Sequence, residues 1–119
     1  MTQDITLLRD IMLFVEEQPP ATSIHSGELA ERFPDLEELF IAEHVLQLKN
    51  EGLIEGFAKI WEREKTSKIR IERITASGHE FIRAVKNDSI WRKAQKFAVE
   101  QGTALTLALL LQFVKTTVE

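Results

Sequence analysis

The chain has 119 residues, of which 44% are hydrophobic, enough for one domain with a single core and too many for a disordered chain. It has no cysteine, which excludes disulfides and thiolate metal sites. The net charge of −4 conceals an asymmetry, because residues 1–58 carry −9 and residues 59–119 carry +5. This asymmetry indicates that one face meets an anionic partner, or that helices of different charge solvate different sides.

The first half of the chain predicts three helices. Apolar spacing predicts a helix over residues 3–17, ended by two prolines, followed by a very short strand at residues 22–24. Ser26 is expected to cap a second helix, which Pro34 closes. Asp35 and Glu38 have the spacing of a capping box for a third helix that runs to Asn50. We expect its inner face to pass through Ile41, Val45 and Leu48, with His44 packed at the border.

A glycine and a change of period predict a β-hairpin after the third helix. Gly52 is expected at the C′ position with positive φ, where glycine carries no Cβ penalty. Residues 53–61 and 68–74 then read as two strands, with Gly56 permitting a bulge. Residues 59–73, around the tip of this hairpin, hold six basic and three acidic residues, Lys59, Arg63, Lys65, Lys68, Arg70 and Arg73 against Glu62, Glu64 and Glu72.

The C-terminal part predicts three further helices. Thr75 is expected to cap a fourth helix, Asn87 a fifth, and Thr103 a last helix over residues 104–118. The last helix is apolar around its whole circumference, which predicts a homodimer through Leu109 and Phe113. We therefore expect one domain over residues 1–119, with a core at 1–86 and a helical extension at 87–119. Its fold class is mainly α with a small β-hairpin wing.

Two sets of residues resemble known families. A helix followed by Gly-Leu-Ile, a hairpin and Ile-Thr-x-x-Gly resembles winged helix-turn-helix regulators. The segments LLRDIMLFVEEQP, HVLQLKNEGLIEG and ITASGHEFIRAVKNDSIWRKAQKFAVEQG are similar to the YjcQ-like family of bacterial and phage winged-helix proteins. The resemblance implies a winged-helix fold with additional C-terminal helices and a prokaryotic or phage origin. DNA binding is implied only by the wider superfamily, and the resemblance brings no catalytic residues.

The sequence offers little for catalysis or cofactor binding. The run that begins at His79 starts like a zinc-protease helix, but Arg83 stands where the second histidine is required. Phosphate-loop, dinucleotide and nucleophile-elbow motifs are absent from the sequence. We therefore expect a protein that is not an enzyme and uses no metal or cofactor. We also expect it to be cytoplasmic, because no run of residues is apolar enough for a bilayer.

Two functions remain open. In the first, the chain is a DNA-binding regulator whose wing contacts phosphates through Arg63, Lys65, Lys68 and Arg70, while Gln47 and Asn50 read bases. In the alternative, it is a protein-interaction module, such as a phage adaptor or inhibitor. Acidic residues on the third helix would then repel phosphate, and the partner would bind Leu39, Phe40, Glu43 and Leu46.

Overall fold

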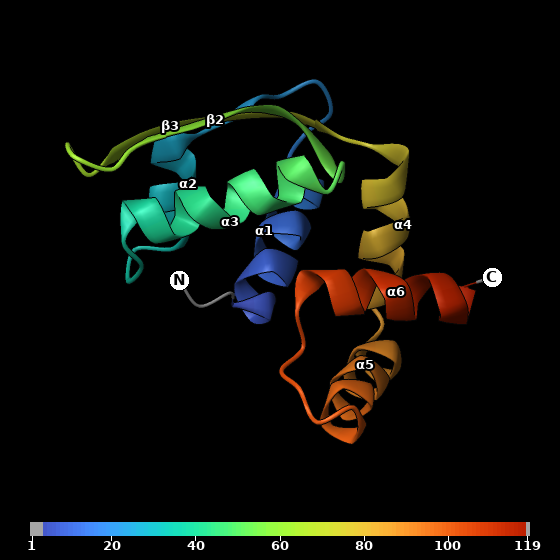
Figure 1. Ribbon diagram of the computed structural model, residues 1–119. Coiled ribbons are helices and arrows are strands. Elements are labelled where there is room, and N and C mark those ends of the chain that lie inside the picture. Colours follow the sequence, from blue (N-terminus) through green and yellow to red (C-terminus); the bar gives the residue numbers. More distant parts are fainter. Residues whose placement is uncertain (1–3, 119) are drawn as a thin grey trace.

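The computed structural model describes residues 4–118, so residue 3, our expected start of the first helix, lies outside the described residues. Within that range there are six helices and one sheet of three antiparallel strands (Figure 1). The fold class is confirmed as mainly α with a small sheet, an arrangement compatible with a winged helix. The elements are α1 (Ile5–Glu17), β1 (Ile24–His25), α2 (Ser26–Arg32), α3 (Glu38–Asn50), β2 (Ile54–Trp61), β3 (Thr66–Ile74), α4 (Ala76–Val85), α5 (Asp88–Glu100) and α6 (Leu107–Val118).

The sheet has the order β1-β3-β2, with the short β1 on the far side of β3 from β2. β1 pairs with β3 only at Ile24 and His25. The Ser26 hydroxyl then accepts a hydrogen bond from the next free β3 amide, that of Ile69, at 2.8 Å. Our expectation that Ser26 caps α2 was wrong, because His25 holds the N-cap position and the hydroxyl of Ser26 completes the sheet edge instead.

Helices α1, α2 and α3 lie on one side of the sheet, and the core fills the space between them (Figure 1). Leu8, Ile11 and Met12 of α1 are fully buried there, and each side chain of this kind contributes about 1.5–3 kcal/mol when removed from water. Ile41, Val45 and Leu48 form the inner face of α3, as expected, together with Ala42.

His44 is a packed histidine with both ring nitrogens satisfied. Its exposed fraction is 0%, its Nε2 accepts from the Asp4 amide at 2.9 Å, and its Nδ1 lies 2.7 Å from the Phe40 carbonyl. A neutral imidazole with its proton on Nδ1 makes both bonds, which tie the first turn of α1 to α3.

The junction between α3 and β2 shows why glycine is required at positions 52 and 78. Gly52 has φ +75°, so its expected C′ role is confirmed, and the next amide, Leu53, donates back to the Leu48 carbonyl at 3.1 Å. Gly78 lies against the same turn, where a Cβ atom would stand 2.0 Å from the Leu53 carbonyl oxygen. Thr75 caps α4 as expected, through a 3.0 Å bond from the Gly78 amide, and its hydroxyl donates to the Gly52 carbonyl. The Thr-x-x-Gly motif therefore fastens α4 onto the end of α3.

The start of α3 differs from our expectation. The helix begins at Glu38 after a turn at residues 33–36, and Glu37 holds the N-cap position without a side-chain bond, so the predicted capping box was wrong. The Glu38 carboxylate instead accepts two hydrogen bonds from Ser67 in β3, from its amide at 3.3 Å and its hydroxyl at 3.0 Å. The hairpin is thereby held to the first turn of α3.

The last helices pack at the opposite end of the molecule from the hairpin tip (Figure 1). Asn87 caps α5 as expected, but α6 begins at Leu107 and not at residue 104, because the Thr106 hydroxyl accepts from the Leu109 amide at 3.3 Å. Thr103 follows the α5 stop at Gly102 and does not cap α6. Among the described residues, no helix is long and apolar enough to cross a membrane.

Candidate nucleic-acid interface

The side of the sheet that faces away from α1–α3 is open to solvent, and we call it the outer sheet face. Burial alternates along both long strands. Between the bulge at Gly56 and the hairpin tip, the even-numbered residues of β2 and the odd-numbered residues of β3 are turned inward. No described helix covers this face (Figure 1). Its residues are His25 from β1, Glu55, Phe57, Lys59 and Trp61 from β2, and Thr66, Lys68, Arg70, Glu72 and Arg73 from β3.

Two lysines stand directly opposite each other on the outer sheet face. Lys59 of β2 and Lys68 of β3 are register partners, and both side chains are exposed. Neither makes an ion pair with an acidic side chain of the described residues. Like charges directly opposite each other in a sheet are destabilising, so this pair has an electrostatic cost that an anion would relieve.

The other charges on this face are partly balanced. Arg70 lies 3.0 Å from Glu72, a pair in which both side chains are about half exposed. Arg73 donates to both carboxylate oxygens of Glu55, at 2.5 and 2.8 Å. These hydrogen bonds lower the pKa of Glu55 and raise the pKa of Arg73, since each stabilises the charged form of its partner. The unbalanced positive charge therefore lies toward the tip, at Lys59 and Lys68.

The tip carries the remaining predicted phosphate-contacting residues. Arg63 and Lys65 lie in the four-residue turn between β2 and β3, and Lys65 adopts a left-handed φ of +55°. Glu62 and Glu64 in the same turn balance them, so the tip alone has no net charge. The structure thus places Arg63, Lys65, Lys68 and Arg70 along one hairpin.

The two predicted base-reading residues lie elsewhere. Gln47 is half-buried and Asn50 exposed on α3, which packs against the inner side of the sheet, whereas Lys68 and Arg70 point outward. Glu38, at the start of α3, is bonded to Ser67 near the tip, and a helix rises about 1.5 Å per residue. Asn50 therefore lies about 18 Å farther along α3. The six predicted residues form two clusters on different sides of the sheet.

The predicted partner-binding residues of α3 are less exposed than the sequence suggested. Leu39, Phe40, Glu43 and Leu46 are all half-buried, and Phe40 packs against the core with its ring 4.5 Å from that of His44. By contrast, the large apolar side chains exposed among the described residues are Leu36, Phe57, Trp61 and Val99. Two of these four lie on the outer sheet face. Sequence reasoning missed them, because both faces of β2 contain apolar residues and alternation alone does not show which of them point outward.

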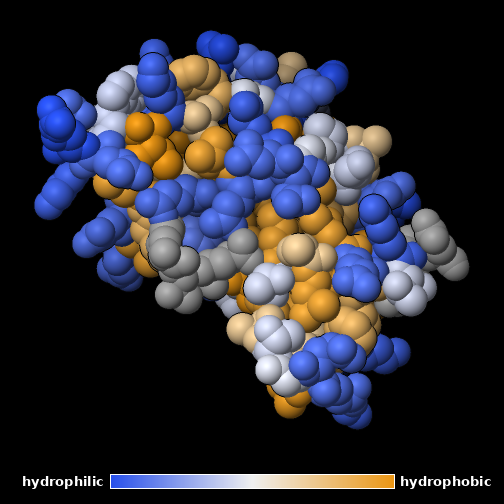
Figure 2. Space-filling model, viewed as in Figure 1, coloured by the Kyte–Doolittle hydropathy of each residue, from blue (hydrophilic) through white to orange (hydrophobic). Residues whose placement is uncertain are grey.

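Helix α6 buries only part of its apolar surface against the rest of the chain. Leu107, Leu110 and Val114 are buried, and Phe113 packs against Phe97 of α5 with ring centroids 5.5 Å apart. Leu109 is half-buried. Apolar residues gather on the surface around α6 (Figure 2). Dimerisation through Leu109 and Phe113 stays a prediction that light scattering can check.

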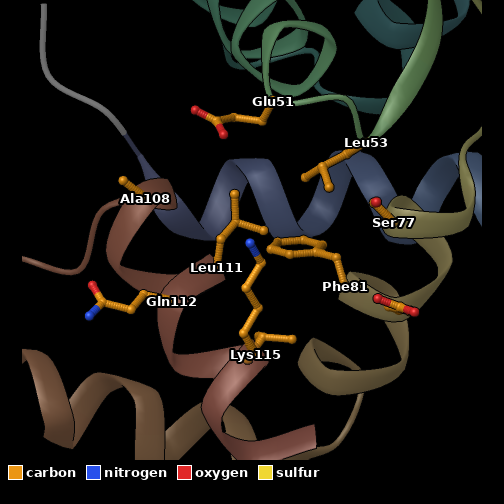
Figure 3. A pocket seen from close by; sticks show the side chains of 10 residues that line it. Glu51, Leu53, Ser77, Phe81, Ala108, Leu111, Gln112 and Lys115 are labelled. Carbon is orange, nitrogen blue, oxygen red and sulfur yellow. The ribbon is translucent and has the colours of Figure 1, made fainter. Parts of the chain in front are cut away.

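A cavity of about 410 Å³ lies between α4, α6 and the turn after α3 (Figure 3). Leu53, Phe81 and Leu111 give it an apolar lining, and the Lys115 side chain extends toward the Phe81 ring. Glu51 and Glu80 line the same cavity, so its one cation is outnumbered by carboxylates. It matches a phosphate less well than the outer sheet face does.

Comparison with known proteins gives a family and no further relative. No curated protein and no solved structure matches the chain. A family model described as "Hypothetical protein (DUF2513)" matches residues 2–104. This match covers most of the chain, including the entire hairpin and α3, and the protein therefore belongs to the DUF2513 family.

Proposed function

We propose that the protein is a DNA-binding module that holds phosphates on the outer sheet face and the hairpin tip. The observation that carries the proposal is the facing pair Lys59 and Lys68, which lies on an uncovered surface without an acidic partner among the described residues. Arg70, which also pairs with Glu72, lies next along β3 and would add a further phosphate contact. Arg63 and Lys65 would add two more at the tip, where Glu62 and Glu64 balance their charge. Phosphate contacts of this kind supply most of the affinity of a DNA-binding protein.

The resemblance to YjcQ-like winged-helix proteins supports the same role. In a winged helix, the hairpin contacts the DNA backbone while a helix enters a groove. Here the acidic start of α3, with Glu37 at the N-cap and Glu38 in the first turn, opposes entry of that end of the helix into a groove. We therefore assign the main contact to the hairpin, within a cytoplasmic regulator of bacterial or phage origin.

Salt titration of duplex binding tests the proposal. The wild-type protein should bind a labelled duplex of random sequence, measured by fluorescence anisotropy. The logarithm of the binding constant should fall with the logarithm of salt concentration at about −0.9 per phosphate, hence about −4.5 for five basic contacts. Absence of binding at physiological salt, to duplex and single-stranded DNA alike, would overturn the proposal.

The alternative function is a protein-interaction module that uses α3. The observation that favours it is the acidic and apolar composition of the accessible side of α3, at Leu39, Glu43 and Leu46. A Leu39→Ser and Leu46→Ser double variant that stays folded but loses a partner captured from the host, in nuclease-treated extract, would support this function. Unchanged capture would remove α3 as the binding surface.

A further inference from the structure

Two aromatic side chains are exposed on the outer sheet face. Phe57 is 42% exposed and Trp61 is 38% exposed, whereas the neighbouring residues Ala58 and Ile60 of β2 pack against the core. Residues four apart on a strand share one face, so both rings project on the same side of β2. Exposed apolar side chains that share one uncovered face are typical of an interaction surface. An exposed aromatic ring also offers a flat face on which a base can stack.

Basic side chains alternate with these rings in three dimensions. Across the sheet, Arg70 of β3 stands between His25 of β1 and Phe57 of β2, because it is the register partner of both. These three residues and Lys68 line an open hollow of about 430 Å³. Nearer the tip, the Lys59 Nζ atom lies 5.3 Å from the centre of the Trp61 ring. Each ring therefore has a cation within reach of a group bound on it.

This combination matches a nucleotide, whose base stacks on an aromatic ring while its phosphate pairs with a nearby cation. We propose that the outer sheet face binds single-stranded DNA, with bases stacked on Phe57 and Trp61 and phosphates held by Lys59, Lys68 and Arg70. This inference rests on the proposed function and specifies the form of DNA that is bound.

The spacing of the rings favours an unpaired strand. Phe57 and Trp61 are four residues apart, about 13 Å at the rise of a β-strand. Stacked bases in a duplex are about 3.4 Å apart and expose only their edges, so a duplex offers no base faces to rings on this surface. An extended single strand can place two separate bases on the two rings. The duplex then binds through phosphates alone.

Acidic side chains limit where a bound DNA strand can run across the outer sheet face. Glu72 pairs with Arg70, and Glu28 lies 3.4 Å from the His25 ring, so a phosphate near these residues competes with a carboxylate. Glu55 and Arg73 satisfy each other at the far end of β2. Lys59 and Lys68 have no carboxylate partner among the described residues, and along the sheet they lie between the positions of the two rings. We place the strongest phosphate contact at this pair.

The test compares a short labelled oligothymidine with a duplex of equal length. The wild-type protein should bind the single strand more tightly, and binding should quench the emission of Trp61; the other tryptophan, Trp91, is only 8% exposed. Phe57→Leu and Trp61→Leu should each weaken single-strand binding at least about fivefold and leave duplex binding unchanged, because leucine keeps an apolar side chain but has no flat ring. The ring-retaining variants Phe57→Tyr and Trp61→Phe should keep most of the affinity, and circular dichroism checks that all four variants are folded.

Other outcomes separate this inference from the proposed function. If the duplex binds but the leucine variants lose nothing for oligothymidine, stacking is overturned and phosphate binding stands. If neither DNA binds, the proposed function fails as well. If an oligouridine binds as tightly as oligothymidine or more tightly, the assignment to DNA is overturned in favour of RNA.

Discussion

The outer sheet face and the accessible side of α3 belong to one supersecondary unit but present opposite chemistry. The sheet face carries Lys59, Lys68 and Arg70 beside two exposed rings, whereas α3 presents Glu37, Glu38 and half-buried leucines. The two surfaces are separated by the sheet itself, because α3 packs beneath its inner side. A ligand that rests on one surface need not touch the other.

The difference teaches that a hairpin and a helix can have the arrangement of a winged helix while the positive charge lies on the hairpin alone. Glu38 is the residue that links the two regions, since its carboxylate is bonded to Ser67 of β3. Its charge is thus used to hold the hairpin in place. In this protein, the arrangement of the helices alone does not identify the binding surface.

Charge reversal on the hairpin should have the largest effect. Replacing Lys65, Lys68 and Arg70 together by Glu removes three of the proposed phosphate contacts and introduces repulsion. We expect at least about a hundredfold loss of DNA affinity at low salt and a salt slope about three units smaller in magnitude. Fluorescence anisotropy over a range of salt concentrations measures both quantities.

Helix α5 supplies a matched control. It carries three exposed basic residues, so the triple variant Arg92→Glu, Lys93→Glu and Lys96→Glu changes the net charge by the same amount away from the sheet. This variant should lose far less affinity. An equal loss in the two variants would mean that overall charge drives binding, and the contrast between the sheet face and the rest of the surface would lose its basis.

An intermediate effect is expected at Gly52, the residue that sets how β2 leaves α3. Its φ of +75° is unfavourable for a β-branched side chain, so Gly52→Val should lower the free energy of unfolding by about 1–3 kcal/mol, measured by urea titration. Gly27 has open space around it and no left-handed φ, so Gly27→Ala is the control and should not destabilise the protein. Equal stability of the Gly52 variant and the wild-type protein would contradict a strained junction.

Local signals in the sequence predicted the order of elements well. The helix stop at Gly52 and the caps at Thr75 and Asn87 were predicted because each depends on a few neighbouring residues. A very short strand was predicted at residues 22–24 and lies at Ile24–His25, but its pairing with β3 could not be predicted. The same holds for the Ser26 contact to Ile69 and the Glu38 contact to Ser67, since all these contacts join residues 29 to 47 positions apart.

The candidate site was predicted only in part for a similar reason. In β3, Ile69 and Ile71 alternate with Lys68 and Arg70, which identifies the exposed face from sequence. In β2 both faces contain apolar residues, so alternation alone does not show whether Phe57 or Ala58 points inward. The register with β3 decides it, and that register includes the bulge at Gly56, where a Cβ atom would lie 2.0 Å from the Arg70 carbonyl oxygen.

The smallest expected effect concerns how the free energy of unfolding depends on pH through the Glu55–Arg73 ion pair, at the end of the outer sheet face away from the tip. Hydrogen bonds from Arg73 lower the pKa of Glu55 below its ordinary value, so the folded state binds this proton less readily than the unfolded state. The resulting stabilisation is present above the ordinary pKa of glutamate and is lost as pH falls through the lowered value. Glu55→Gln should remove this component and flatten the decline of unfolding free energy on the acid side, by a small amount because the pair is exposed. Urea titrations at a series of acidic pH values, with Glu64→Gln as a control at the tip, measure the difference.

The same Glu55→Gln variant also tests the proposed DNA binding. Since Glu55 pairs with Arg73, its removal should free one cation and slightly strengthen DNA binding at neutral pH. Weaker DNA binding by the Glu55→Gln variant would mean that the ion pair holds the sheet face in its binding geometry and does not compete with DNA for Arg73.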